Sequence, residues 1–100
     1  MTRDREDAGL WQLGACAAAD LLAAGGIKPS ELLASVAGRV AAVNPVINAL
    51  PTLCLDRAEA AARRLDALKP SARGVLGGLP VPVKDSYEVA GVRTTFGSLA

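Results

Sequence analysis

The sequence predicts an α/β fold in which helices come first and a short apolar strand follows. Apolar residues recur at helical spacing from Leu10 to about Leu68. Beyond them Leu79, Val81 and Val83 form a brief apolar run that follows two glycines, which is typical of a strand buried on at least one face. Aromatic residues make up only 3% of the chain, and much of its 51% apolar content is alanine, which buries little area. So thin a core suits a segment that packs against more protein.

The first helix is expected to begin at Leu10, and residues 1–9 before it are charged, aperiodic and predicted to be disordered. Gly25-Gly26 is expected to end this helix. Its buried face is predicted from apolar residues at helical spacing, which are Leu10, Leu13, Ala17 and Leu21.

A second helix is predicted to begin near Pro29, because proline at the first helical position leaves no amide hydrogen unpaired. Glu31 favours this start through the helix dipole, whereas Lys28 stands where a capping serine or threonine is usual and should weaken it. Asn44-Pro45 is expected to stop the helix. Its buried stripe is predicted to be Leu32, Leu33, Val36, Val40 and Val43.

The stretch from Ile47 to Cys54 is expected to be extended but irregular, because it contains Pro51. Asp56 is then predicted to cap a third helix that runs to about Leu68. We expect Glu59 and Arg63 to pair on its outer face. Its inward residues are predicted to be Ala58, Ala62 and Leu65, and its arginines, Arg57, Arg63 and Arg64, to form a solvated face.

Charge and composition narrow the classes of partner. Eleven basic and ten acidic residues give a net charge of +1, which favours neither nucleic acid nor a membrane surface as a direct partner. No run approaches the roughly eighteen apolar residues of a membrane span, so we expect a cytoplasmic protein. With no histidine in the chain, a Ser-His-Asp triad and a histidine metal site are excluded from this segment. No metal or cofactor is expected.

The two cysteines, Cys16 and Cys54, stand in apolar surroundings and lack a CxxC neighbour. We interpret both as small buried hydrophobes, with a disulfide or a catalytic thiol as the lesser alternative.

The candidate catalytic residue is Lys84, which follows the apolar run directly and precedes Asp85. Functional groups of α/β proteins collect at the carboxyl ends of strands, where a rigid element meets an open loop. At the edge of an apolar interior a lysine can lose its proton, because desolvation disfavours the ammonium, and a neutral amine beside a hydroxyl is a general base. Most lysines that follow a strand are simply solvated, and spacing alone leaves that alternative open.

The wider pattern resembles the amidase signature family, the Ser-Ser-Lys amide hydrolases. The resemblance lies in Pro-Val-x-Val-Lys-Asp-x-x-x-Val-x-Gly-x-x-Thr-Thr-x-Gly-Ser from Pro80 to Ser98, and residues 43–49 and the order of elements agree with it. It implies that residues 10–100 are the N-terminal part of a single, truncated amidase-type domain, with helices and the first strands of a larger mixed sheet flanked by helices. The nucleophilic and bridging serines would then lie beyond Ala100.

The resemblance implies hydrolysis of a small-molecule carboxylic amide through a serine acyl-enzyme, with Lys84 as general base. The 100 residues alone are expected to be inactive. Asp85 is predicted to face away from Lys84 and bond the following loop, because a carboxylate in contact would favour the charged lysine. Thr94, Thr95 and Ser98 are interpreted as turn-forming residues.

Two alternatives stay open. One is the A-type subunit of a glutamine-dependent tRNA amidotransferase, which belongs to the same family. The other is a small, non-catalytic helical interaction module or a decayed gene product that retains the motif. The oligomeric state is not indicated by the sequence.

Overall fold

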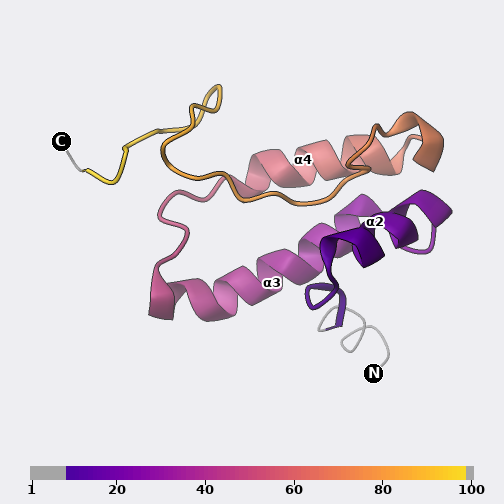
Figure 1. Cartoon of the computed structure of the whole chain (residues 1–100), viewed down its shortest axis with the longest axis horizontal. Helices are drawn as coiled ribbons and strands as arrows, with labels where there is room; N and C mark the ends of the chain where they lie inside the picture. The colour runs from indigo at the N-terminus through magenta and orange to yellow at the C-terminus, as the bar shows by residue number, and fades with distance from the viewer. Residues whose placement is uncertain (1–8, 99–100) are drawn as a thin grey trace.

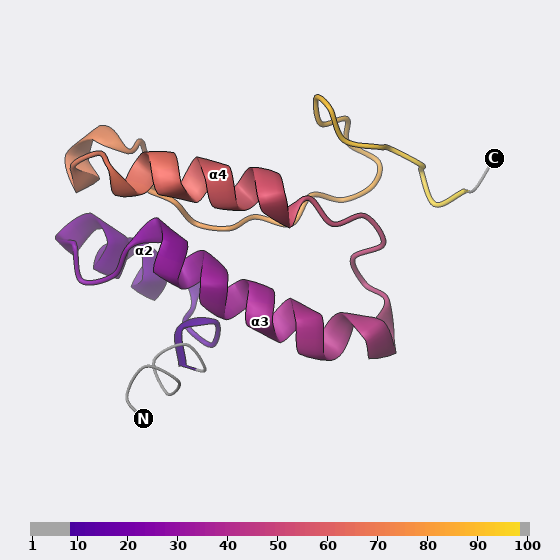
Figure 2. The ribbon, with the colours of Figure 1, turned by 180° about the vertical axis from the view of Figure 1, so that it is seen from behind.

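The computed structural model describes residues 9–98, which leaves most of the predicted disordered N-terminus, residues 1–8, outside the described part. Its elements are α2 (Ala15–Ala24), α3 (Pro29–Ile47), α4 (Leu55–Asp66) and the short 3₁₀-helix η1 (Pro70–Ala72). The helices α3 and α4 run antiparallel, side by side (Figure 1). The views from both sides place α2 and the chain that returns after η1 on one face of this pair (Figures 1 and 2). The prediction that the first two thirds of the chain are helical is confirmed.

The helix α2 begins at Ala15 and not at Leu10. The amides of Gln12 and Leu13 donate to the carbonyls of Gly9 and Leu10, at 3.1 Å each, so the chain turns before Gly14 and restarts as a helix. This break rotates the later residues relative to the predicted face. The buried residues are therefore Ala18 and Leu22, at 3% and 1% exposure, and the predicted Ala17 and Leu21 are exposed.

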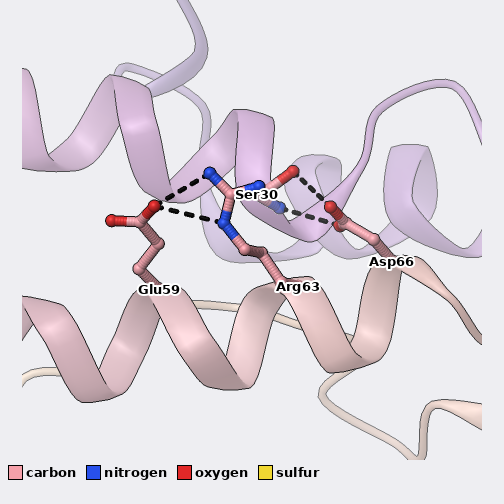
Figure 3. Close-up of polar contacts among 4 residues, drawn as sticks. All are labelled: Ser30, Glu59, Arg63 and Asp66. Carbon is pink, nitrogen blue, oxygen red and sulfur yellow. Dashed lines mark hydrogen bonds and ion pairs between the residues drawn. The ribbon is translucent and has the colours of Figure 1, made fainter.

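The start of α3 obtains its cap from another helix. Lys28 precedes Pro29 and its side chain accepts no hydrogen bond, but its backbone amide donates to the Glu31 carboxylate at 2.9 Å. The amide of Ser30 donates to Asp66 of α4 at 3.0 Å, and its hydroxyl donates to the other oxygen of that carboxylate at 2.5 Å. Asp66 thereby satisfies an amide that the first turn of a helix otherwise leaves unpaired. Figure 3 shows Ser30 and Asp66 between the two helices.

The prediction that Asn44-Pro45 stops the second helix is wrong, because α3 continues to Ile47 with Pro45 inside its last turn. A proline near the end of a helix removes only one hydrogen bond, and the turn continues around it. Asn48 caps the end of the helix, and its left-handed backbone (φ 48°) lets its amide donate to the Asn44 carbonyl at 2.7 Å. The Asn44 amide group then holds Leu50 by two hydrogen bonds of 2.9 Å, one to each backbone group. This clamp turns the chain toward α4.

The helix α4 agrees with its predicted inner and outer faces. Ala62 is buried at 6% exposure, and Ala58 and Leu65 are half-buried. Arg63 and Glu59 form the predicted ion pair at 2.9 Å, with both side chains more than half exposed. The helix begins one residue before Asp56, so that residue lies in the first turn instead of at the cap, and Cys54 occupies the cap position.

The core lies where α2, α3 and the returning chain meet. Ala18, Leu22 and Leu32 are its buried centre, with Val36 and Leu79 among the partly buried residues packed against them. From the predicted stripe of α3, Leu32 and Leu33 are buried, whereas Val36, Val40 and Val43 are half-buried. The core is thus as small as the composition predicts.

The residues from Leu79 to Val83 do not form the predicted strand. Between residues 9 and 98 the structure contains no strand, and its only β-bridge joins Val89 to Val92. A strand exists only through hydrogen bonds to a neighbouring strand, and none lies beside this segment in the described part of the chain. The regular elements within residues 9–98 are therefore helices, and these residues contain no part of the sheet that the predicted α/β fold requires.

The prediction that both cysteines are buried is wrong. Cys16 and Cys54 are exposed, and both are free thiols. Cys16 stands on the side of α2 away from Ala18 and Leu22, and Cys54 belongs to the linker before α4, so apolar neighbours in the sequence did not become neighbours in space.

No helix within residues 9–98 has both the length and the apolar character that crossing a bilayer requires.

Candidate functional site

The chain that carries Lys84 is fixed to the helices at Gly78. The Gly78 backbone has φ +108°, and a Cβ there would lie 2.7 Å from two side-chain carbons of Pro29, which is itself fully buried. Only glycine combines this backbone conformation with so close an approach. Leu79 then packs against the core, and the chain runs on alongside α3 and α4 toward the first turn of α4 (Figure 1).

Lys84 lies at the end of this returning segment, exposed, and its carbonyl accepts the Tyr87 amide at 3.0 Å. The two apolar residues before it, Val81 and Val83, are 60% and 53% exposed. The apolar enclosure expected around the lysine is therefore not supplied by residues 9–98. Within that range Lys84 forms no ion pair, because Arg63–Glu59 is the single pair present there.

Asp85 faces the following loop, as predicted. One carboxylate oxygen accepts the Thr95 amide at 2.8 Å, and the other accepts the Thr95 hydroxyl. The Asp85 carbonyl also accepts the Phe96 amide at 3.0 Å. We call these three bonds the Asp85 clasp. It closes the loop from Asp85 to Gly97 at its base and draws the carboxylate away from the lysine.

The clasp favours the ionised form of Asp85. The Thr95 hydroxyl and then the Thr95 amide lower the pKa of this carboxyl below its ordinary value of 3.8, and the nearby charge of Arg93 contributes in the same direction. The clasp is therefore a charge-assisted contact at neutral pH.

The tip of the loop is held by α4. Val89 and Val92 pair across a turn in which the Val92 amide donates to the Val89 carbonyl at 3.0 Å. The turn presents the Ala90 carbonyl to Arg57, whose Nη1 lies 2.5 Å from it. Gly91, at φ +77°, leaves room for this contact, since a Cβ there would stand 3.3 Å from the same nitrogen.

Of the three hydroxyl residues predicted to form turns, Thr95 has that local role in the structure, with one addition. The Thr95 hydroxyl accepts the Gly97 amide at 3.2 Å, as in a turn-forming residue, and also donates to Asp85. The Ser98 amide donates to the Thr95 carbonyl at 3.0 Å. Thr94 is half-buried. Thr95 is thus the centre of the loop's hydrogen bonding.

Two arginines have roles that sequence reasoning missed. Arg57 is exposed, as predicted, and it also donates to the Ala90 carbonyl, 33 residues away. Arg73 donates to the carbonyls of Leu65, Leu68 and Leu22, at 2.9, 3.2 and 3.4 Å, and so joins the C-terminal ends of α2 and α4. Neither contact has a signal in the local sequence, because an arginine that bonds a distant carbonyl needs no particular neighbour.

A separate groove lies between α3 and α4. It encloses about 180 Å³ and is lined by Ser30, Leu33, Ala34, Ala37, Leu55, Glu59 and Arg63. We call residues 84–97 the Lys84 loop. None of its residues borders the groove, so the groove and the loop are distinct features. The described residues hold no cluster of three or more cysteines and carboxylates that could bind a metal ion.

The chain is similar to a known protein family and to named proteins of several bacteria. A family model described as Amidase matches residues 31–100. A relative from Shouchella clausii is 39% identical over 79 residues, which is 79% of this chain and 16% of the relative. Relatives from Anaeromyxobacter dehalogenans and Chloroflexus aurantiacus are 38% and 41% identical over 89% of this chain, and over 18% and 19% of their own lengths.

By name, all three relatives are A-type subunits of glutamyl-tRNA(Gln) amidotransferase. The chain spans less than a fifth of the length of each of them. No solved structure matches the chain significantly.

Proposed function

The chain belongs to the amidase signature family, and from this membership we propose that Lys84 is the general base of an enzyme that hydrolyses a carboxylic amide through a serine acyl-enzyme. The observation that carries the proposal is the separation of Lys84 from Asp85. These adjacent residues have opposite charges, yet the carboxylate is engaged by Thr95 on the loop side. A carboxylate partner would stabilise the ammonium form of the lysine, and that form cannot accept a proton.

The proposed reaction assigns one proton path to Lys84. The amine accepts the proton of a bridging serine, which accepts that of the nucleophilic serine as its oxygen attacks the amide carbonyl. The carbon–nitrogen bond then breaks, the returning proton leaves with ammonia or an amine, and an ester to the serine remains. Water hydrolyses this ester and restores the enzyme. Both serines belong, in this proposal, to sequence beyond Ala100.

The same proposal extends to the fold. Residues 10–100 would form the first part of a single amidase-type domain, whose mixed sheet includes the segment around Val81 and Val83. The exposure of these two apolar side chains supports it, because alternating apolar residues without a sheet neighbour are suited to pairing with one. The greater length of the relatives is consistent with such a domain.

The setting that the comparisons favour is a component of a glutamyl-tRNA(Gln) amidotransferase, for which the family resemblance implies glutamine as the amide. This choice rests on the shared name of the relatives, which describes the A-type subunit of glutamyl-tRNA(Gln) amidotransferase. A free-standing amidase that acts on another small amide is the second candidate, because the family assignment by itself is to Amidase.

The test of the base is Lys84→Ala in the intact protein, with ammonia release from carboxamides as the measurement. We expect turnover to fall by several powers of ten, as for members of a catalytic triad, because no other group would take the serine proton. Lys69→Ala is the matched control, since Lys69 is an exposed lysine outside the loop. A Lys84→Ala rate within about tenfold of wild type would remove Lys84 from the mechanism.

A second assay separates the two settings. Glutamine hydrolysis that depends on added glutamyl-tRNA(Gln) favours the amidotransferase component. Hydrolysis of simple carboxamides by the protein alone, at a rate that the tRNA does not change, favours the free-standing amidase.

A further inference from the structure

The loop that follows Lys84 is anchored at two places, and only one of them is local. The Asp85 clasp closes the base of the loop immediately after Lys84, using Thr95 and Phe96. The second anchor is Arg57, which reaches from the first turn of α4 to the Ala90 carbonyl at the tip. A loop closed only at its base can swing as a body, whereas a second attachment at the tip fixes its direction.

We infer that Arg57 is a positioning residue, which holds the Lys84 loop against α4 and so sets where the lysine lies in the site. This inference rests on the proposed function of Lys84. The contact is charge-assisted, since a guanidinium donates to a carbonyl at 2.5 Å, and such bonds are stronger than those between neutral groups. Gly91 supports the same geometry, because its missing side chain leaves the guanidinium 3.3 Å from where a Cβ would stand.

The choice of Arg57 over the other arginines of α4 follows from their contacts. Arg63 is paired with Glu59 on the side that faces α3, at 2.9 Å (Figure 3). Arg64 is exposed and lies in the last turn, away from the loop. Arg57 alone among these three reaches the Lys84 loop in the described structure.

The test compares Arg57→Ala with Arg64→Ala in the intact protein, by kcat, KM and thermal melting. Misplacing a catalytic group by about an ångström costs about a hundredfold, so we expect kcat of Arg57→Ala to fall between about tenfold and a hundredfold. KM should change by less than about threefold, because the positioned group acts in the proton transfer and not in substrate binding. Arg57→Lys should recover part of kcat, since its ammonium can donate to the same carbonyl. Arg64→Ala should match wild type.

A double variant separates positioning from general destabilisation. If Arg57 acts through Lys84, then Arg57→Ala in a Lys84→Ala background should change the residual rate by less than about twofold. An equal loss in both backgrounds, or a melting temperature well below that of Arg64→Ala, would give Arg57 a merely structural role and overturn the inference. A kcat of Arg57→Ala equal to that of Arg64→Ala would also overturn it.

The outcomes of the two proposals are distinguishable. An active Lys84→Ala variant refutes the proposed function, and the inference with it. An inactive Lys84→Ala variant beside a fully active Arg57→Ala variant leaves the function in place and refutes only the role of Arg57.

Discussion

At Asp85 a single carboxylate accepts both the amide and the hydroxyl proton of Thr95, ten residues further along the chain. The direction of this side chain could be predicted, because a base next to a carboxylate is better served when the carboxylate points elsewhere. Its partner Thr95 could be placed in the loop but not paired with Asp85 from spacing alone. Arg57 could not be found at all, since its contact spans 33 residues and leaves no local pattern.

Acid should open the Asp85 clasp. Because the pKa of Asp85 is lowered in the folded protein, the clasp stabilises the loop fully above the ordinary value of 3.8. That contribution is lost as the pH falls below 3.8 and passes the lowered pKa. The Thr95 amide resonance should therefore shift with a midpoint below pH 3.8, and Asp85→Asn, which keeps the shape but not the charge, should abolish the shift. A Thr95 transition above pH 3.8 would contradict this assignment.

At the scale of elements, the periodicity of apolar residues predicts that the helices exist. Where each helix begins and ends depends on contacts that this periodicity does not contain. The register of α2 changed because the turn at Gln12 and Leu13 interrupts the helical spacing. The end of α3 moved past Pro45 because Asn44 and Asn48 complete the last turn around the proline. Lys28 precedes α3 and provides no side-chain cap. Asp66 of α4 instead accepts the hydrogen bond of the Ser30 amide in the first turn of α3.

Removing Asp66 should destabilise the pairing of α3 with α4. Asp66→Ala leaves the Ser30 amide without its acceptor, and the loss of a helix cap costs about 0.5–2 kcal/mol. Glu59→Ala is the matched control on the same helix face, where an exposed ion pair contributes about 0.5 kcal/mol or less. Urea denaturation of the protein measures both. Equal losses in the two variants would show that Asp66 is no more than another surface charge.

At the scale of the whole molecule, the small core leaves much of the returning segment to be held at a few points. Val81 and Val83 are exposed although their alternation predicts a strand, because pairing requires a neighbour that the described residues do not provide. The motif around Lys84 could be recognised in the sequence from its pattern of residue types. The attachment of this segment to the helices could not be predicted, because the contact of Gly78 with Pro29 joins parts of the chain almost fifty residues apart.

Adding one methyl group at Gly78 should loosen this attachment. A Cβ there meets Pro29 at 2.7 Å and disfavours the backbone conformation, so Gly78→Ala should cost about 1–3 kcal/mol in the free energy of unfolding. Gly38→Ala, in the middle of α3 with nothing within 4 Å, should instead stabilise the protein by about 0.5–1 kcal/mol. Limited proteolysis beyond Gly78 should be faster in the first variant alone. A neutral Gly78→Ala would mean that the returning segment is not held there.

The clamp between Asn44 and Leu50 also bears on the order in which the chain acquires its structure. It closes over six residues, whereas the Ser30–Asp66 contact spans 36 and the Arg73–Leu22 contact spans 51. Since the entropy lost on closing a loop grows with its length, the clamp can form while α4 is still emerging from the ribosome. The Arg57–Ala90 contact spans 33 residues and the Ser30–Asp66 contact spans 36, so we expect both to close after the clamp and at similar entropic cost.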